Sequence, residues 1–106
     1  MQELREYKGV LHVHTAYSDS FGRMPYIIDC ARKAGIGYVV VSDHYSLKSK
    51  QEGWEGWHDG VLLVIGVEVT SRKGHAMVIG IDQCPRWRDT HPDEYLPEVE
   101  RLGGTA

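Results

Sequence analysis

An α/β domain built on a parallel sheet is the fold class that the sequence predicts. Strand-like and helix-like segments alternate along the chain, and residues 38–42 form a continuously apolar run, typical of a strand covered on both faces. Histidines and carboxylates recur where the predicted strands end, which is where parallel α/β proteins gather their ligands. The 106 residues, 42% of them hydrophobic, suffice for one small domain, and no repeat or linker divides them.

The first predicted strand covers residues 9–14. Side chains alternate along a strand, which predicts two faces: Val10, His12 and His14 on one, and Leu11 and Val13 on the other. The apolar face indicates that this strand belongs to the core.

A loop, a helix and a second strand follow. Residues 15–23 are polar and contain glycine, which indicates a loop. Pro25 suits the first turn of a helix and Gly35 is typical of a helix end, so a helix is expected between them. The buried strand at residues 38–42 comes next.

The second half of the chain continues the alternation. Residues 45–60 are a polar excursion with room for a short helix, residues 61–69 form a third strand, and residues 74–81 form a fourth. A loop at residues 82–90 leads to a helix at residues 92–102.

That last helix ends at Gly103 and Gly104, a pattern that usually leads into another strand. Four strands and two clear helices correspond to the first half of a β/α barrel, which takes about 200 residues or more to close. We therefore expect residues 1–106 to be an incomplete N-terminal portion of a domain, with the missing C-terminal half as its partner.

Charge and hydropathy exclude some classes of function. The formal net charge of -3 creates no overall field that attracts nucleic acid or an anionic membrane. The apolar runs are far shorter than the ~20 residues of a spanning helix. The charged N-terminus lacks a signal-peptide core. These features predict a soluble, cytoplasmic protein.

Two cysteines are present, and neither has a spacing typical of structural zinc. The helical pattern places Cys30 on a buried side. We expect Cys30 and Cys84 to be reduced thiols without chemistry, with a disulfide as the alternative.

The pair His12 and His14 is the strongest chemical signal. Two residues apart on a strand, both imidazoles point the same way and can reach one ion at the ~2.0–2.1 Å that nitrogen ligands of zinc require. The alternative is a pair of surface histidines, but buried imidazoles without partners would be costly. The pair therefore predicts a metal site.

Three further candidates follow the first two strands. Asp19 lies in the loop after the first strand, where an aspartate among serines is also a common turn former. His44 follows the buried strand as His14 follows the first. Asp43 is either a carboxylate that orients a ligating histidine by a hydrogen bond or a turn cap.

Glu68 and His75 complete the candidate set. A carboxylate at the end of the apolar run VLLVIGV must be paired or bound to metal; the alternative to metal is a salt bridge to Arg72 or Lys73. His75 opens the next strand, where a lone histidine is also a common structural residue.

Together the candidate ligands are too many for one tetrahedral ion: His12, His14, Asp19, His44, Glu68 and His75. Two or more ions are implied, and such a cluster can activate water and clamp a phosphate oxygen. Because no cysteine joins them, zinc, manganese or iron is favoured. His58 and His91 are interpreted as surface or capping residues.

Four segments, in order and spacing, resemble the first motifs of the PHP domain, the polymerase and histidinol phosphatase family. They are HVHTAYSD at 12–19, VSDH at 41–44, GVE at 66–68 and GHAMVIG at 74–80. The resemblance runs from about Gly9 to the end of the chain. It implies the N-terminal half of a distorted (β/α)7 TIM-like barrel with parallel strands, up to three metal ions and phosphoesterase activity.

The resemblance also implies roles for the ligands. His12 and His14 would hold the first ion, Glu68 would bridge the first and second, His75 would reach the second, and Asp19 and His44 would hold the third. A bridging hydroxide would attack phosphorus directly, so no side chain is expected to act as nucleophile.

Two departures from the family pattern stand out. Ser20 replaces a glycine that the family often has. The later ligands of the family, a His after the Gly-Gly helix and further His and Asp-x-His positions, have no counterpart in these 106 residues. Weak or no catalysis is therefore expected from residues 1–106 alone.

The leading hypothesis is a metal-dependent hydrolase of a phosphate monoester or nucleotide, with a phosphorylated small molecule as substrate. Two alternatives are a nuclease or polymerase-associated editing domain, which lacks a basic stripe here, and a non-catalytic metal-binding module. Arg23, in the loop that carries Asp19, is the candidate contact for substrate phosphate. The other basic side chains are expected to be exposed to solvent without a specific role.

Overall fold

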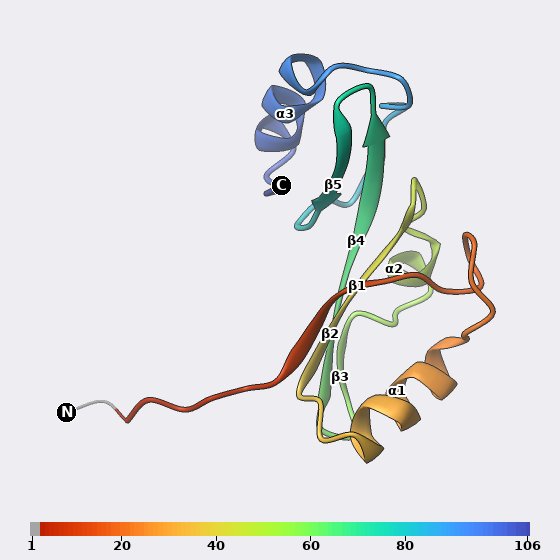
Figure 1. Cartoon of the computed structure of the whole chain (residues 1–106), viewed down its shortest axis with the longest axis vertical. Helices are drawn as coiled ribbons and strands as arrows, with labels where there is room; N and C mark the ends of the chain where they lie inside the picture. The colour runs from red at the N-terminus through yellow and green to blue at the C-terminus, as the bar shows by residue number, and fades with distance from the viewer. Residues whose placement is uncertain (1–2) are drawn as a thin grey trace.

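Two apolar strands form the centre of the sheet. In the computed structural model, which describes residues 3–106, β2 (Tyr38–His44) and β4 (Val61–Ser71) run parallel and side by side (Figure 1). Branched side chains fill both strands, and their inner positions are almost completely buried, as for Val41, Ile65 and Val67. The buried strand predicted at residues 38–42 is confirmed.

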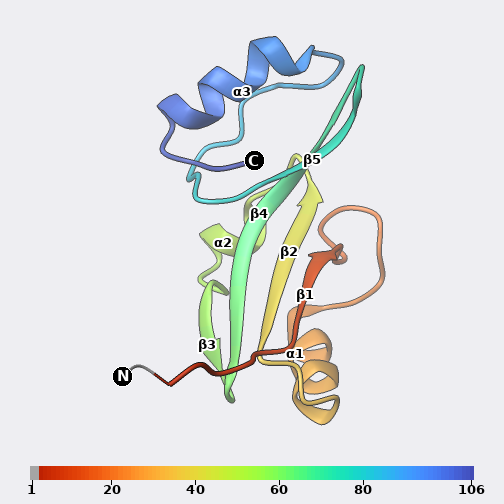
Figure 2. The same cartoon turned by 60° about the vertical axis from the view of Figure 1, so that its left-hand side comes forward.

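Three shorter strands complete the sheet. β1 (Gly9–Val13) pairs parallel with β2, while β3 (Gly56–His58) and β5 (Gly74–Val78) pair antiparallel with β4. The strand order is β1-β2-β4-β3, with β5 also on β4. The result is a mixed sheet that does not close into a barrel within residues 3–106 (Figure 2).

The expectation of an α/β fold with a parallel centre is confirmed, but the expectation of parallel strands throughout is wrong. The turn between β4 and β5 is too short for the crossover that parallel strands require, so β5 folds back on β4. The sequence pattern also missed β3. Asp59 and Gly60, which join β3 to β4, both have positive φ angles of 50° and 82°, as in a tight hairpin turn.

Three helices flank the sheet. α1 (Met24–Lys33) packs Met24, Ile28 and Ala31 against it. The short α2 (Lys48–Gln51) lies in the predicted excursion, and α3 (Pro92–Arg101) lies beside β5 at the other end of the molecule from α1 (Figures 1 and 2). α1 and α3 have ten residues each, and no helix within residues 3–106 is long and apolar enough to cross a membrane.

β1 differs from its prediction in two ways. It is an edge strand, so Val10 and Leu11 are 38% and 57% exposed instead of belonging to the core. Its register with β2 also shifts: Val10 pairs with Val39 and Val13 pairs with Val41, so three residues of β1 span the same length as two residues of β2. Because of this bulge, Val10 and Val13 both line a shallow apolar groove against α1, and Val10 does not share the face of His12.

Both cysteines are free. Cys30 is exposed rather than buried, because the buried stripe of α1 runs through Ile28 and Ala31 and leaves the position before Ala31 outside it. Cys84 is partly buried, and this burial raises the pKa of its thiol.

Candidate metal centre

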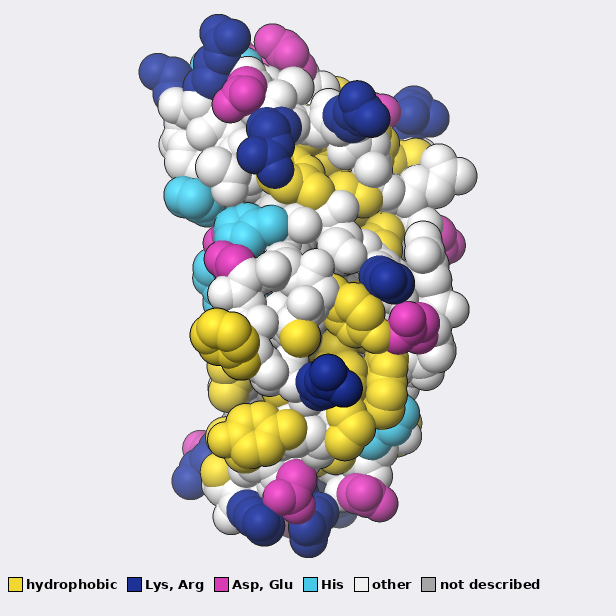
Figure 3. Space-filling view, turned by 90° about the vertical axis from the view of Figure 1, so that its right-hand side faces the viewer, with side chains coloured by type: hydrophobic (Ala, Val, Ile, Leu, Met, Phe, Trp, Pro, Cys, Tyr) yellow, Lys and Arg dark blue, Asp and Glu magenta, His cyan; other side chains and the backbone are white. Residues whose placement is uncertain are grey.

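The candidate ligands meet at the carboxyl ends of β1 and β2, beside the second half of β4. β1 and β2 run parallel, so His14, directly after β1, and His44, at the end of β2, arrive at the same end of the sheet. His44 lies opposite Glu68 in the β2–β4 ladder. On the face of the molecule drawn in Figure 3, histidine and acidic side chains gather at the left margin, and basic side chains lie above them. The topology therefore brings together residues that are 24 or more positions apart in sequence.

Glu68 is the centre of this cluster. Its side chain is 5% exposed, and its carboxylate oxygens lie 2.6 Å from His12 Nε2 and 3.0 Å from His44 Nδ1. His14 Nε2 and His75 Nδ1 lie 3.6 and 3.8 Å from the same carboxylate. Among residues 3–106 the ion-pair partners of Glu68 are all histidines, so the alternative of a salt bridge to Arg72 or Lys73 is not what the structure shows.

His12, His14 and Glu68 form the first candidate metal site. The two Nε2 atoms lie 3.0 Å apart. Two nitrogens bound to one ion at ~2.0–2.1 Å are also about 3 Å apart, so this spacing fits a shared ion. The prediction that the alternation of β1 aims both imidazoles at one point is confirmed by this spacing, despite the bulge.

His14, Asp19 and His44 form the second candidate site. Asp19 Oδ1 lies 2.6 Å from His14 Nδ1, and Asp19 Oδ2 lies 3.2 Å from His44 Nε2. Desolvation raises the pKa of the Asp19 carboxyl, but hydrogen bonds from His14 and Ser18 outweigh it, so the net pKa lies below its ordinary value. The carboxylate is therefore charged at neutral pH, as a metal ligand must be.

The two candidate sites share His14. A neutral imidazole has one nitrogen with a free lone pair, and its other nitrogen carries a proton. If His14 Nε2 faces an ion together with His12, then His14 Nδ1 donates its proton to Asp19 at 2.6 Å. A histidine that ligates through one nitrogen while a carboxylate accepts from the other is a common arrangement in metal sites.

Asp43 holds the loop that carries Asp19. It is buried, and its oxygens accept hydrogen bonds from Thr15 N and Thr15 Oγ1, both at 2.6 Å, and from Ser18 Oγ at 2.7 Å. Its hydrogen-bond partners within residues 3–106 include no histidine, so of the two alternatives predicted for Asp43 the contacts fit the turn cap and not the carboxylate that orients a histidine. Asp43 instead fixes the backbone between His14 and Asp19.

His75 lies beside the cluster but in neither candidate site. It pairs with Thr70 in the β4–β5 ladder, two positions beyond Glu68, and its side chain is 60% exposed. Its Nδ1 lies 3.1 Å from Thr70 Oγ1 and 3.8 Å from Glu68. Within residues 3–106, the other five predicted ligands belong to a candidate metal site and His75 does not.

A cavity of about 450 Å³ opens next to the second candidate site. Its lining consists of Ser18, Asp19, His44, Tyr45, Thr70 and Arg88. Arg23, the predicted phosphate contact, lines a different cleft with Tyr17 and Met24. Sequence reasoning missed Arg88, because it lies 44 positions from His44 in an irregular loop without a motif.

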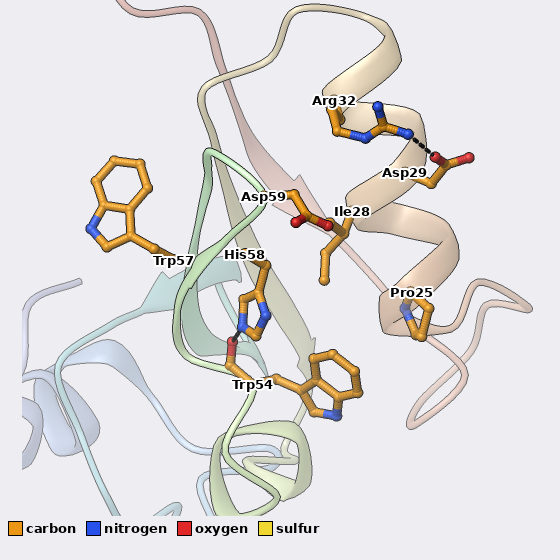
Figure 4. A pocket seen from close by; sticks show the side chains of 8 residues that line it. All are labelled: Pro25, Ile28, Asp29, Arg32, Trp54, Trp57, His58 and Asp59. Carbon is orange, nitrogen blue, oxygen red and sulfur yellow. Dashed lines mark hydrogen bonds and ion pairs between the residues drawn. The ribbon is translucent and has the colours of Figure 1, made fainter.

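A larger cleft of about 960 Å³ lies at the opposite end of the sheet, between α1 and β3 (Figure 4). We do not place the functional site there, because His58 is its one histidine and donates to Trp54 O at 2.8 Å. His91 accepts a hydrogen bond from Asp93 N as the N-cap of α3. The capping role predicted for His91 is confirmed, whereas His58 is half-buried and bonds a backbone carbonyl, so it is neither a surface residue nor a helix cap.

Comparison with known proteins gives one distant relative. The chain is 29% identical over 114 residues to an uncharacterized protein, MJ1587, of Methanocaldococcus jannaschii. The alignment covers 93% of this chain and 64% of the relative, so the chain spans just under two thirds of that protein. No family model matches the chain.

Proposed function

We propose that this chain carries the metal-binding part of a phosphoesterase that hydrolyses a phosphate monoester or a nucleotide. The observation that carries the proposal is Glu68, a buried carboxylate whose ion-pair partners within residues 3–106 are four histidines. A buried carboxylate surrounded by imidazoles at strand ends is costly as a purely structural device and well suited to divalent cations.

The donor set supports zinc, manganese or iron. All candidate ligands offer nitrogen or carboxylate oxygen, and none is a thiolate. His12, His14 and Glu68 would hold one ion, and Asp19 and His44 would hold another, with His75 as the nearest further donor. Bound there, such ions would supply an activated water near neutral pH and neutralise phosphate charge.

The chain's own residues would position the reaction. Asp43 keeps the His14–Asp19 segment in place, and the ladder between β2 and β4 fixes His44 against Glu68. The cavity of about 450 Å³ beside Asp19 has room for a phosphate group with a small organic part. This size favours a phosphorylated small molecule over a nucleic acid strand, as does the net charge of -3.

A second candidate function is a metal-binding module without turnover. The donors of the first candidate site come from β1, from the position directly after it and from β4, so a bound ion would tie separate strands together. This arrangement favours a role in which metal stabilises the fold and does no chemistry.

Metal analysis combined with turnover of p-nitrophenyl phosphate separates the two candidates. Protein purified without chelator is expected to contain at least one equivalent of zinc, manganese or iron. Turnover is measured on the complete protein that contains residues 1–106, which is expected to release p-nitrophenol when it is loaded with metal. His14→Asn should lose both metal and turnover. His91→Asn, which retains a helix cap, is the matched control and should lose neither. Full metal content without hydrolysis of any phosphate ester would favour the module.

A further inference from the structure

The loop between β5 and α3 is held firmly on both sides of Arg88. Trp87 is 2% exposed, and its Nε1 donates to Glu98 Oε2 of α3 at 2.7 Å. Thr90 donates to the Trp87 carbonyl, and its own carbonyl accepts from Arg72 N at 3.2 Å. Arg88 therefore projects from a backbone segment that packing and hydrogen bonds fix in place.

The Arg88 side chain contacts an aromatic ring beside the candidate metal centre. Its guanidinium carbon lies 5.1 Å from the centre of the Tyr45 ring, within the range of a cation–π contact. Tyr45 is itself held, because its hydroxyl donates to Thr70 O at 2.5 Å and accepts from Thr70 N at 2.9 Å. The ring thus keeps the guanidinium beside the strand ends.

Arg88 has no carboxylate partner within residues 3–106. The ion pairs found there involve other arginines, lysines and histidines. Yet Arg88 lines the same cavity as Asp19 and His44, two members of the second candidate metal site. An arginine that contacts an aromatic ring, lines a cavity and lacks an acidic partner within residues 3–106 is well placed to receive an anion.

We propose that Arg88 binds the terminal phosphate of a small phosphate monoester in this cavity. A guanidinium can donate two parallel hydrogen bonds to phosphate oxygens, which fixes both the position and the orientation of the group. A monoester carries close to two negative charges at neutral pH and leaves three oxygens free, so it can contact Arg88 and the metal cluster together. This inference names the substrate class of the proposed phosphoesterase and rests on that function.

The test measures binding of inorganic phosphate to metal-loaded protein by calorimetry, for wild type, Arg88→Met and Arg88→Lys. Arg86→Met is the matched control, because Arg86 is an exposed arginine of the same loop outside the cavity lining. Arg88→Met should weaken phosphate binding by about 10- to 100-fold. Arg88→Lys should restore part of the loss, since lysine keeps the charge but not the planar fork.

Metal content and the urea midpoint should be the same for all four proteins, which separates a binding defect from misfolding. Phosphate binding that is unchanged in Arg88→Met, or absent from the loaded wild-type protein, would overturn the assignment. If the protein has no turnover but its phosphate binding still depends on Arg88, the proposed function fails and the assignment of Arg88 as a phosphate ligand stands. If Arg88→Met hydrolyses phosphate esters with the same KM as the wild type, the proposed function stands and the role of Arg88 is overturned.

A diester comparison tests the monoester class. Arg88→Met should lower kcat/KM for p-nitrophenyl phosphate more than for bis(p-nitrophenyl) phosphate, because the diester has only one negative charge and two free oxygens for the guanidinium. Equal losses for the two substrates would rule out a preference for a terminal phosphate.

Discussion

Glu68 is the side chain on which the candidate site converges, and its charge can be removed with little change of shape. Glu68→Gln should lower zinc affinity at least 10-fold, because an amide is a poor ligand and the first candidate site loses its buried carboxylate. The metal-free variant should be at least as stable as the wild type, since a buried charge becomes neutral. Calorimetric titration with zinc and urea unfolding measure the two effects. Unchanged zinc affinity would contradict the placement of Glu68.

Asp43 allows a second test at the scale of single residues. Asp43→Asn replaces a buried acceptor of three hydrogen bonds with a group that can accept fewer. The free energy of unfolding should fall by about 1–3 kcal/mol, measured by urea denaturation. Asp29→Asn is the control, because Asp29 forms surface pairs with Arg32 and Lys33 that contribute little. An equal effect of both variants would show that Asp43 does not anchor the loop.

The residue scale also shows what local patterns can and cannot predict. The pairing of His12 with His14 depends only on alternation within one strand, and the importance of Glu68 follows from the cost of burying a charge. The partners of Asp43 are 25 and 28 positions away, and no local pattern encodes them. Arg88 likewise reaches the cavity only because Trp87 is buried against α3.

At the scale of elements, Gly66 sets the distance between β4 and the chain after β5. A Cβ at this position would lie 2.1 Å from Val78 O and 2.8 Å from Ile79 Cγ2. Gly66→Ala should therefore push β5 away and lower the free energy of unfolding by about 1–3 kcal/mol. It should also weaken metal binding, because Glu68 follows two residues later.

The control for this change is Gly37→Ala. A Cβ there would lie 3.5 Å from Lys8 O, an ordinary contact, and Gly37 does not have a positive φ angle. Urea midpoints and zinc titrations of the two alanine variants can be compared directly. If Gly66→Ala proves as stable as Gly37→Ala, the close approach of β5 is not required by the fold.

Most elements follow from local sequence, and their pairing partly does. The apolar run of β2 and the proline and glycine that bracket α1 act within a few residues, so the sequence predicts these elements well. The β4–β5 connection is predictable as a turn, and its shortness requires the antiparallel pairing that the alternation of strands and helices does not indicate. The bulge in β1 is set by contacts with β2 and α1, which alternation cannot reveal.

At the scale of the whole molecule, metal binding should be linked to folding. The ligands come from β1, β2, β4 and the loop after β1, so the unfolded chain has no assembled site. An ion present at 100 times its dissociation constant would add about 2.7 kcal/mol of stability. For a domain of this size the midpoint of thermal unfolding should rise by roughly 10–20 °C.

Thermal unfolding with zinc and with EDTA checks this linkage. The difference between the two conditions should shrink as the pH is lowered, because protonated imidazoles do not ligate. Glu68→Gln should show at most about half of the wild-type difference, because a 10-fold lower affinity leaves about 1.4 kcal/mol of stabilisation at the same zinc concentration. A midpoint that is the same with zinc and with EDTA would mean that the cluster does not bind the ion in the folded protein.

The bulge of β1 has a consequence for how this chain can change in length. Between Val10 and Val13 the strand holds one residue more than its ladder with β2 needs, so losing Leu11 would restore a regular ladder and leave both valines facing α1. The β2–β4 ladder has no such spare residue, and a deletion there would turn every later side chain, including His44 or Glu68, to the opposite face. Insertions and deletions among descendants of this sequence should therefore be tolerated in β1 and the turns, and be absent from β2 and β4.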